Sequence, residues 1–197
     1  MKKIICVTPK ISFTEYKNER IELEYNWINY LKKMNYQVMT LNETNISYFK
    51  KFKPSCIIIS GGGDIFDISK KKINLKRDTF EINLFKLFYK KIPIICVCRG
   101  AQLIGSKIYE SKLYKVNNHI RTNHDIFNKK IKLNVNSYHK YSFKILDKSF
   151  NEVFYHKDKS IELAISSKNK VMLSMFHPER PNKDQNKINK IIKLFLS

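Results

Sequence analysis

A continuous apolar run at residues 92–97 passes directly into small and helix-forming residues at 99–105. The run predicts a strand buried on both faces of a parallel sheet, and the segment after it predicts a helix. Cys98 falls on the turn between them. Such a turn holds a thiol above the sheet edge, and the N–H groups of the first helical turn favour its thiolate. We interpret Cys98 as a nucleophile with Gly100 leaving room for a carbonyl, the alternative being a buried structural cysteine.

Short apolar runs alternate with helical patterns along the rest of the chain. Strands are expected at 3–8, 37–41, 56–60 and 171–176, and helices at 21–31, 46–52, 78–88 and 185–196. This alternation predicts an α/β fold, with a mostly parallel central sheet flanked by helices. A chain of 197 residues can bury one sizeable core, so we expect a single domain over residues 1–197.

The helix predicted at 78–88 has a polar start. Asp78 is placed to cap it, and Glu81 three residues later completes a pattern like a capping box. The alternative is that Arg77 or Glu81 faces a cleft at the sheet edge.

Three glycines, Gly61, Gly62 and Gly63, directly follow the apolar run at 56–60. The lysine and the serine or threonine of a phosphate-binding loop are missing, so that interpretation is weak. Glycines at this place can present backbone N–H groups to an oxyanion, because they adopt positive φ and allow a close approach. A plain turn is the alternative. If the neighbouring strands are parallel, this loop and Cys98 meet at one sheet edge.

An apolar run at 171–176 delivers His177 to the end of a strand, and Pro178 stops the ladder there. A neutral imidazole at this position can accept the proton of Cys98. Glu179 can hold the other ring nitrogen and stabilise the imidazolium. A histidine before a proline is more often a loop residue, but the cysteine turn and the glycine loop change that expectation.

The remaining histidines are His119, His124, His139 and His156. Their spacing matches no pair on one helix face, and no acidic ligand is obviously placed with them. We expect no metal and no cofactor, and assign these residues to substrate contact or loop stabilisation.

All four cysteines, Cys6, Cys56, Cys96 and Cys98, fall in apolar segments and are expected to be reduced. The apolar run at the start is too short for a signal peptide, and no stretch approaches the roughly 18 residues of a membrane span. We expect a cytoplasmic protein without membrane contact.

The chain carries 38 Lys and Arg against 17 Asp and Glu, a net charge of +21. Such a charge attracts polyanions, so a nucleic-acid-binding protein is the non-enzyme alternative. The lysines are spread along the chain and no recognition motif is present, which indicates a solvated basic surface. The positive charge of this surface would still attract a small anionic substrate.

Together these motifs resemble a known family. Residues 98–102 (CRGAQ) with 177–179 (HPE) are similar to the class I glutamine amidotransferase-like superfamily. The glycine loop with Asp64, the 77–81 segment and residues 135–139 (VNSYH) are closer to its gamma-glutamyl hydrolase branch, of the peptidase C26 type. The resemblance covers nearly the whole chain and implies a flavodoxin-like architecture.

The resemblance also implies site roles. Cys98 would be the nucleophile, His177 the base and then acid, and Glu179 the orienting carboxylate, acting through a glutamyl thioester. The oxyanion hole would come from the backbone N–H of Arg99 and of Gly62 or Gly63. The substrate pocket would be formed by Gln102, Asn136, Ser137, Tyr138 and His139.

Two departures from the family pattern concern the substrate pocket more than the triad. Cys96 stands where the family usually has glycine, and 109–116 lacks a common glycine-rich turn. A lysine-rich member of this branch is similar to the gamma-glutamyl-CDP-amidate hydrolases of capsular phosphoramidate synthesis. The implied partner is a small gamma-glutamyl substrate, nucleotide-linked in that case. The alternatives are gamma-glutamyl-gamma-aminobutyrate or another small amide, and a partner-dependent glutaminase subunit.

Overall fold

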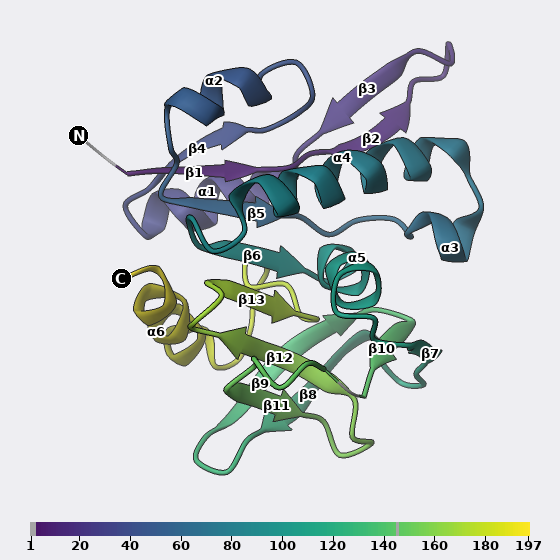
Figure 1. The fold of residues 1–197 in the computed structure, drawn as a ribbon. Coiled ribbons are helices and arrows are strands. Elements are labelled where there is room, and N and C mark those ends of the chain that lie inside the picture. The colour runs from purple at the N-terminus through teal and green to yellow at the C-terminus, as the bar shows by residue number, and fades with distance from the viewer. Residues whose placement is uncertain (1–2, 145) are drawn as a thin grey trace.

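A nine-stranded sheet forms the centre of the computed structural model, which describes residues 3–144 and 146–197 (Figure 1). Its strand order is β4-β1-β5-β6-β13-β12-β11-β8-β9. The parallel half comprises β4 (Gln37–Thr40), β1 (Ile4–Val7), β5 (Cys56–Ile59), β6 (Ile94–Val97) and β13 (Val171–Ser174). The predicted α/β fold with a mainly parallel sheet is confirmed.

The other half of the sheet is antiparallel and was not predicted. It comprises β12 (Ile161–Ser166), β11 (Glu152–Tyr155), β8 (Ile120–Phe127) and β9 (Lys132–Tyr138). The hairpin of β8 and β9 joins β11 through a single residue pair, Tyr155 with Phe127. The polar composition of β8 and β9 hid these two strands from an apolar-pattern search.

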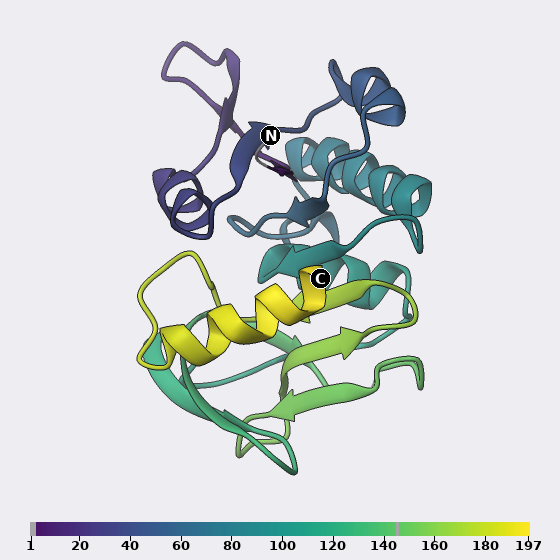
Figure 2. The ribbon, with the colours of Figure 1, turned by 90° about the vertical axis from the view of Figure 1, so that its left-hand side faces the viewer.

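Helices cover both faces of the sheet. They are α1 (Tyr25–Lys33), α2 (Ile46–Lys51), α3 (Phe66–Ser69), α4 (Lys72–Phe88), α5 (Arg99–Lys107) and α6 (Gln185–Leu196). Side chains of α2, α4 and α5 pack into one apolar cluster, and those of α1 and α6 pack into another. Figure 2 shows α6 lying along one face of the sheet. Within the described residues, no helix is both long and apolar enough to cross a bilayer.

Two small antiparallel pairs stand beside the central sheet. β2 (Lys10–Phe13) pairs with β3 (Glu19–Glu22), and β7 (Leu113–Lys115) pairs with β10 (Tyr141–Phe143). The helix expected over 21–31 is therefore wrong at its start, because Ile21 belongs to β3 and α1 begins at Tyr25.

The capping role expected for Asp78 is also wrong. α4 begins at Lys72, so Asp78 lies inside this helix. Its carboxylate accepts a hydrogen bond of 2.7 Å from the backbone N–H of Phe66, the first residue of α3. The same carboxylate forms an ion pair with Arg99. Asp78 and Glu81 are thus three residues apart because both pair with Arg99, and not because they cap a helix.

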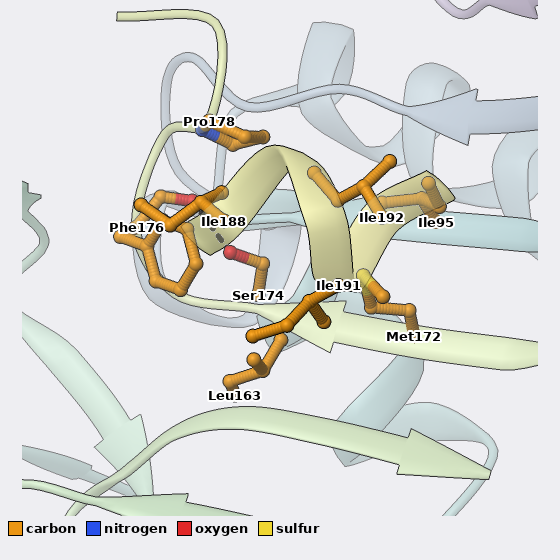
Figure 3. Close-up of a pocket in the computed structure, with 9 residues that line it drawn as sticks. All are labelled: Ile95, Leu163, Met172, Ser174, Phe176, Pro178, Ile188, Ile191 and Ile192. Carbon is orange, nitrogen blue, oxygen red and sulfur yellow. Dashed lines mark hydrogen bonds between the residues drawn. The ribbon is translucent and has the colours of Figure 1, made fainter. Parts of the chain in front are cut away.

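Figure 3 shows a small apolar cavity between α6 and the sheet, lined by side chains such as Ile95, Met172 and Ile192. Its volume is about 10 Å³, room for one water molecule at most. We regard it as a packing gap of the core.

Candidate active site

Cys98 lies at the sharp turn between β6 and α5. Its backbone has φ 50° and ψ −106°, a conformation that non-glycine residues rarely adopt. The N–H of Cys98 donates to the carbonyl of Ser174 at 2.6 Å, so the end of β13 holds the turn in place. Strain of this kind at a non-glycine residue is typical of functional sites.

His177 follows β13 and faces Cys98. Its Nδ1 lies 2.6 Å from Oε1 of Glu179, and both side chains are buried. Its backbone is fixed by Asn136, which accepts the N–H of His177 at 2.9 Å and donates to its carbonyl at 2.8 Å. The structure therefore brings Cys98, His177 and Glu179 together.

The pKa of His177 reflects these neighbours. Burial would lower it, but the charge of Cys98 and a hydrogen bond with its sulfur, followed by the same two effects from Glu179, raise the pKa of His177 to about 10. At neutral pH the imidazole therefore carries a proton. A protonated histidine beside a cysteine favours the thiolate that nucleophilic attack requires.

The glycine loop packs directly against this pair. A Cβ at Gly61 would stand 2.7 Å from Cε1 of His177 and 3.4 Å from Cβ of Cys98, so only glycine fits. Gly62 and Gly63 have φ of 87° and 77°, which turns the chain over the site.

A buried arginine holds the loop from behind. Nη1 of Arg77 donates to the carbonyl of Gly62 at 2.8 Å, and Nη2 donates to that of Ser60 at 2.9 Å. These contacts fix the carbonyl groups of the loop in place. The sequence reasoning placed Arg77 near this edge but did not detect this role.

Glu81 connects the loop to the nucleophile helix. Its carboxylate pairs with Arg77 at 2.9 Å and with Arg99, the first residue of α5, and it is fully buried. Asp78 pairs with Arg99 as well. The two segments expected to supply the oxyanion hole thus share one ion-pair network, and the side chain of Arg99 points into that network.

The residues expected to line a substrate pocket differ in their exposure. Gln102 is buried and donates to the carbonyl of Tyr141 at 2.9 Å, and the Ser137 hydroxyl donates to that of His119 at 2.7 Å. His139 lies in a separate buried cluster. Only Tyr138 is well exposed among the five, and its ring lies edge-on to that of His177 with 5.7 Å between centroids.

Arg180 was not predicted as a site residue. Its guanidinium lies 4.6 Å from the centroid of the Tyr138 ring and pairs with Glu24 at 2.6 Å. No motif marks Arg180, because it lies outside the HPE pattern. Its cation–π contact with the Tyr138 ring forms only in the folded chain.

A cavity of about 140 Å³ adjoins the His177 and Glu179 side of the site. Its other walls include Lys10 and Glu22 of the β2–β3 hairpin, Trp27 of α1, and the glycine loop. The hairpin therefore contributes charge of both signs next to the catalytic candidates.

All four cysteines are free. Burial raises the pKa of Cys96 well above its usual value and that of Cys6 to about 12, whereas Cys98 lies beside an imidazolium. Cys96 and Cys6 are thus inert core thiols.

Comparison with known proteins identifies the family of the chain. The family model for glutamine amidotransferase class-I matches residues 18–195, and the chain belongs to that family. A Campylobacter jejuni gamma-glutamyl-CDP-amidate hydrolase is 32% identical over 141 residues, which cover 71% of this chain and 69% of the relative. The carbamoyl phosphate synthase small chain of Cyanidium caldarium is 32% identical over 115 residues, covering 56% of this chain and 26% of its own length.

Solved structures share the fold. A protein from Thermoplasma acidophilum, assigned as a subunit of GMP synthase, superposes with a TM-score of 0.74 at 14% identity, covering 100% of this chain and 93% of its own. A glutamine amidotransferase from Thermotoga maritima gives 0.62 at 14% identity, covering 99% and 83%. PurLQS from the same organism gives 0.66 at 17% identity, covering 100% of both chains.

Proposed function

We propose that this protein hydrolyses a gamma-glutamyl amide through a thioester on Cys98. The observation that carries the proposal is the placement of Cys98 on a strained turn, beside His177, whose Nδ1 is held by Glu179 at 2.6 Å. The family and the C. jejuni relative, named as a hydrolase, support the same chemistry.

The reaction has two halves. The Cys98 thiolate attacks the gamma-carbonyl carbon, and the oxygen gains the negative charge of a tetrahedral intermediate. Backbone N–H groups of Arg99 and of Gly62 or Gly63 stabilise this oxyanion. His177 gives its proton to the leaving nitrogen, the C–N bond breaks, and a glutamyl thioester remains on the sulfur.

Water completes the cycle. His177, now neutral, takes a proton from a water molecule as the water oxygen attacks the thioester carbonyl. The C–S bond breaks, glutamate leaves, and the Cys98 thiolate and the imidazolium are restored. Glu179 keeps the ring oriented and stabilises its charged form throughout.

For the leaving group, we propose cytidine diphosphoramidate, released from gamma-glutamyl-CDP-amidate. The name and the 32% identity of the C. jejuni relative support this substrate. The net charge of +21 favours a pyrophosphate-bearing molecule, and Lys10 stands in the cavity beside His177. The protein would act in the synthesis of a capsular phosphoramidate, in the cytoplasm.

Glutamate release from three substrates tests the proposal: gamma-glutamyl-CDP-amidate, gamma-glutamyl-gamma-aminobutyrate and glutamine. We expect turnover of the nucleotide-linked amide, and none of it by Cys98→Ala. Preferred cleavage of gamma-glutamyl-gamma-aminobutyrate would keep the mechanism and overturn the substrate. Full activity in Cys98→Ala would overturn the mechanism.

A further inference from the structure

Four of the chain's five histidines gather in one cluster away from Cys98. The ring centroid of His119 lies 4.6 Å from that of His124, 4.9 Å from that of His139 and 5.0 Å from that of His156. His119, His124 and His139 are buried. His124 lies in β8, His119 directly precedes β8 and His139 directly follows β9, so strand pairing brings them together and their sequence spacing shows no ligand pattern.

A buried carboxylate lies among these rings. Oε2 of Glu162 is 3.3 Å from Nε2 of both His124 and His139, and its Oε1 is 3.3 Å from Nδ1 of His119. Glu162 is fully buried. Both oxygens of this buried carboxylate therefore face imidazole nitrogens.

The outward ring nitrogens have partners of a kind that is common around metal ligands. Nε2 of His119 lies 3.0 Å from a carboxylate oxygen of Asp158, Nδ1 of His139 lies 3.2 Å from the carbonyl of Tyr141, and Nδ1 of His156 lies 2.9 Å from that of Asp125. Such contacts fix the proton on the outward nitrogen of each ring. The lone pair of the opposite nitrogen can then bind a metal ion.

Several ring nitrogens of the cluster lack a well-aligned hydrogen bond among the described residues. They are Nδ1 of His119 and both ring nitrogens of His124, although these side chains are only 1% and 7% exposed. Buried polar atoms are almost always satisfied, so an unsatisfied group of this kind calls for an ion or a water. Bare imidazole nitrogens facing a carboxylate point to a cation.

We propose that His119, His139, Glu162 and His124 form a binding site for a divalent transition-metal ion of the Zn²⁺ class. Donor atoms of His119, His139 and Glu162 lie within 4.8 Å of one another, as do those of His119, His124 and His156. Zn²⁺ bonds of 2.0–2.1 Å give donor separations of about 3.3 Å in a tetrahedron, which equals the Glu162 contacts. His156 stands next to this set.

The site lies where two neighbouring strands of the sheet, β8 and β11, share only one residue pair. His119, His124 and His139 belong to the segment of β8 and β9, whereas His156 and Glu162 belong to that of β11 and β12. Apart from one pair between β8 and β11, no ladder joins these segments in the described chain. An ion held by both sides would fasten the hairpin to the rest of the sheet, as a closed structural site does.

The position of the β8–β9 hairpin affects the candidate catalytic residues. β9 carries Asn136, which fixes the backbone of His177, and Tyr138, which lies against its ring. The carbonyl of Tyr141 faces both His139 and Gln102 of the nucleophile helix. The ion is thus inferred to be structural and replaces our expectation of no metal at these histidines. The inference does not depend on the identity of the leaving group.

Metal analysis and Co²⁺ titration test the site. The full-length protein, stripped with a chelator and dialysed, is titrated with Co²⁺ and then Zn²⁺. We expect one equivalent to bind, with the visible absorption of tetrahedral Co²⁺ that Zn²⁺ abolishes. Absence of stoichiometric binding by the folded wild-type protein would overturn the proposal, and this outcome requires no variant.

Variants locate the ion. Glu162→Gln keeps the shape of the side chain and should weaken Co²⁺ binding by at least about tenfold, as should Asp158→Asn outside the ligand set. His177→Ala, which removes the one histidine outside the cluster, should bind as the wild type does. Loss of the ion in His177→Ala, or its unchanged binding in Glu162→Gln, would contradict the assignment.

Hydrogen exchange supplies a second readout. Removing the ion should speed amide exchange in β8 and β9 while β1 and β5 stay protected. Equal exchange with and without Zn²⁺ would overturn the structural role.

Discussion

Gly61 lies so close to His177 that a Cβ at position 61 would stand 2.7 Å from Cε1 of the imidazole. The glycine loop and the histidine are therefore one packed unit. We expect Gly61→Ala to displace the ring from Cys98 and lower kcat by about a hundredfold, because small misplacements of a catalytic group are costly. Gly105→Ala is the control, since position 105 lies inside α5 and the atoms nearest to a Cβ there belong to the ring of Phe143, at 3.1 Å or more. Equal activity of the two variants would contradict the packing argument.

The charge of Cys98 is the first of the effects that raise the pKa of His177. Replacing the thiol in Cys98→Ala should therefore lower the pKa of His177 from about 10. NMR titration of the imidazole measures this change. Cys96→Ala, at a buried position on β6, should leave the pKa of His177 unchanged. A pKa that stays near 10 in Cys98→Ala would show that Glu179 alone sets it.

The same shift predicts how stability depends on pH. A pKa raised in the folded state stabilises the protein fully below the ordinary value of 6.5, and this contribution is lost as pH rises through about 10. The free energy of unfolding of the wild type should thus fall more than that of His177→Gln between these limits. Urea unfolding at a series of pH values measures the difference, and parallel curves would contradict the prediction.

The carboxylate of Glu81 is the shared ion-pair partner of two buried arginines, Arg77 and Arg99. Glu81→Gln leaves Arg77 and Arg99 without their shared carboxylate and should lower the free energy of unfolding by about 3 kcal/mol. Glu19→Gln, which breaks an exposed pair with Lys76, should cost less than about 1 kcal/mol. Similar losses in the two variants would mean that the buried network adds little.

Lys10 tests the proposed leaving group. If it meets a phosphate of the substrate, Lys10→Gln should raise KM for gamma-glutamyl-CDP-amidate about tenfold, the effect of losing a contact to a charged group. Turnover of a substrate without phosphate should change little. Lys193→Gln, on the exposed side of α6, is the matched charge control. An equal effect of both lysine variants would assign the loss to the overall field.

The parallel half of the fold could be predicted because its strands are short, apolar and buried on both faces. The turn at Cys98 and the strand that precedes His177 follow from the same pattern, although β13 ends at Ser174. The β8–β9 hairpin could not, since residues such as Asn134 and Asn136 hydrogen-bond to polar groups, those of Asp125 and His177, that meet them only in the folded chain. Polar contacts that form only in the folded chain leave no periodic signal.

The prediction about Gly100 was wrong for a related reason. Gly100 was expected to make room for a substrate carbonyl, but a Cβ there would overlap the carbonyl of Ile59, so the glycine allows close packing of α5 on β5. Glu162 shows no motif at all, because its three histidine neighbours are brought together only by strand pairing. The substrate roles of Gln102, Asn136 and their neighbours stay predictions.

The central claim is a covalent glutamyl intermediate on Cys98, and mass spectrometry tests it directly. The enzyme is mixed with gamma-glutamyl-CDP-amidate, quenched in acid during turnover and digested. We predict a hydroxylamine-sensitive glutamyl adduct on the peptide that contains Cys98, absent from Cys98→Ala and enriched in Glu179→Gln if deacylation slows. Turnover without any adduct, or an adduct on Cys96 instead, would contradict the account.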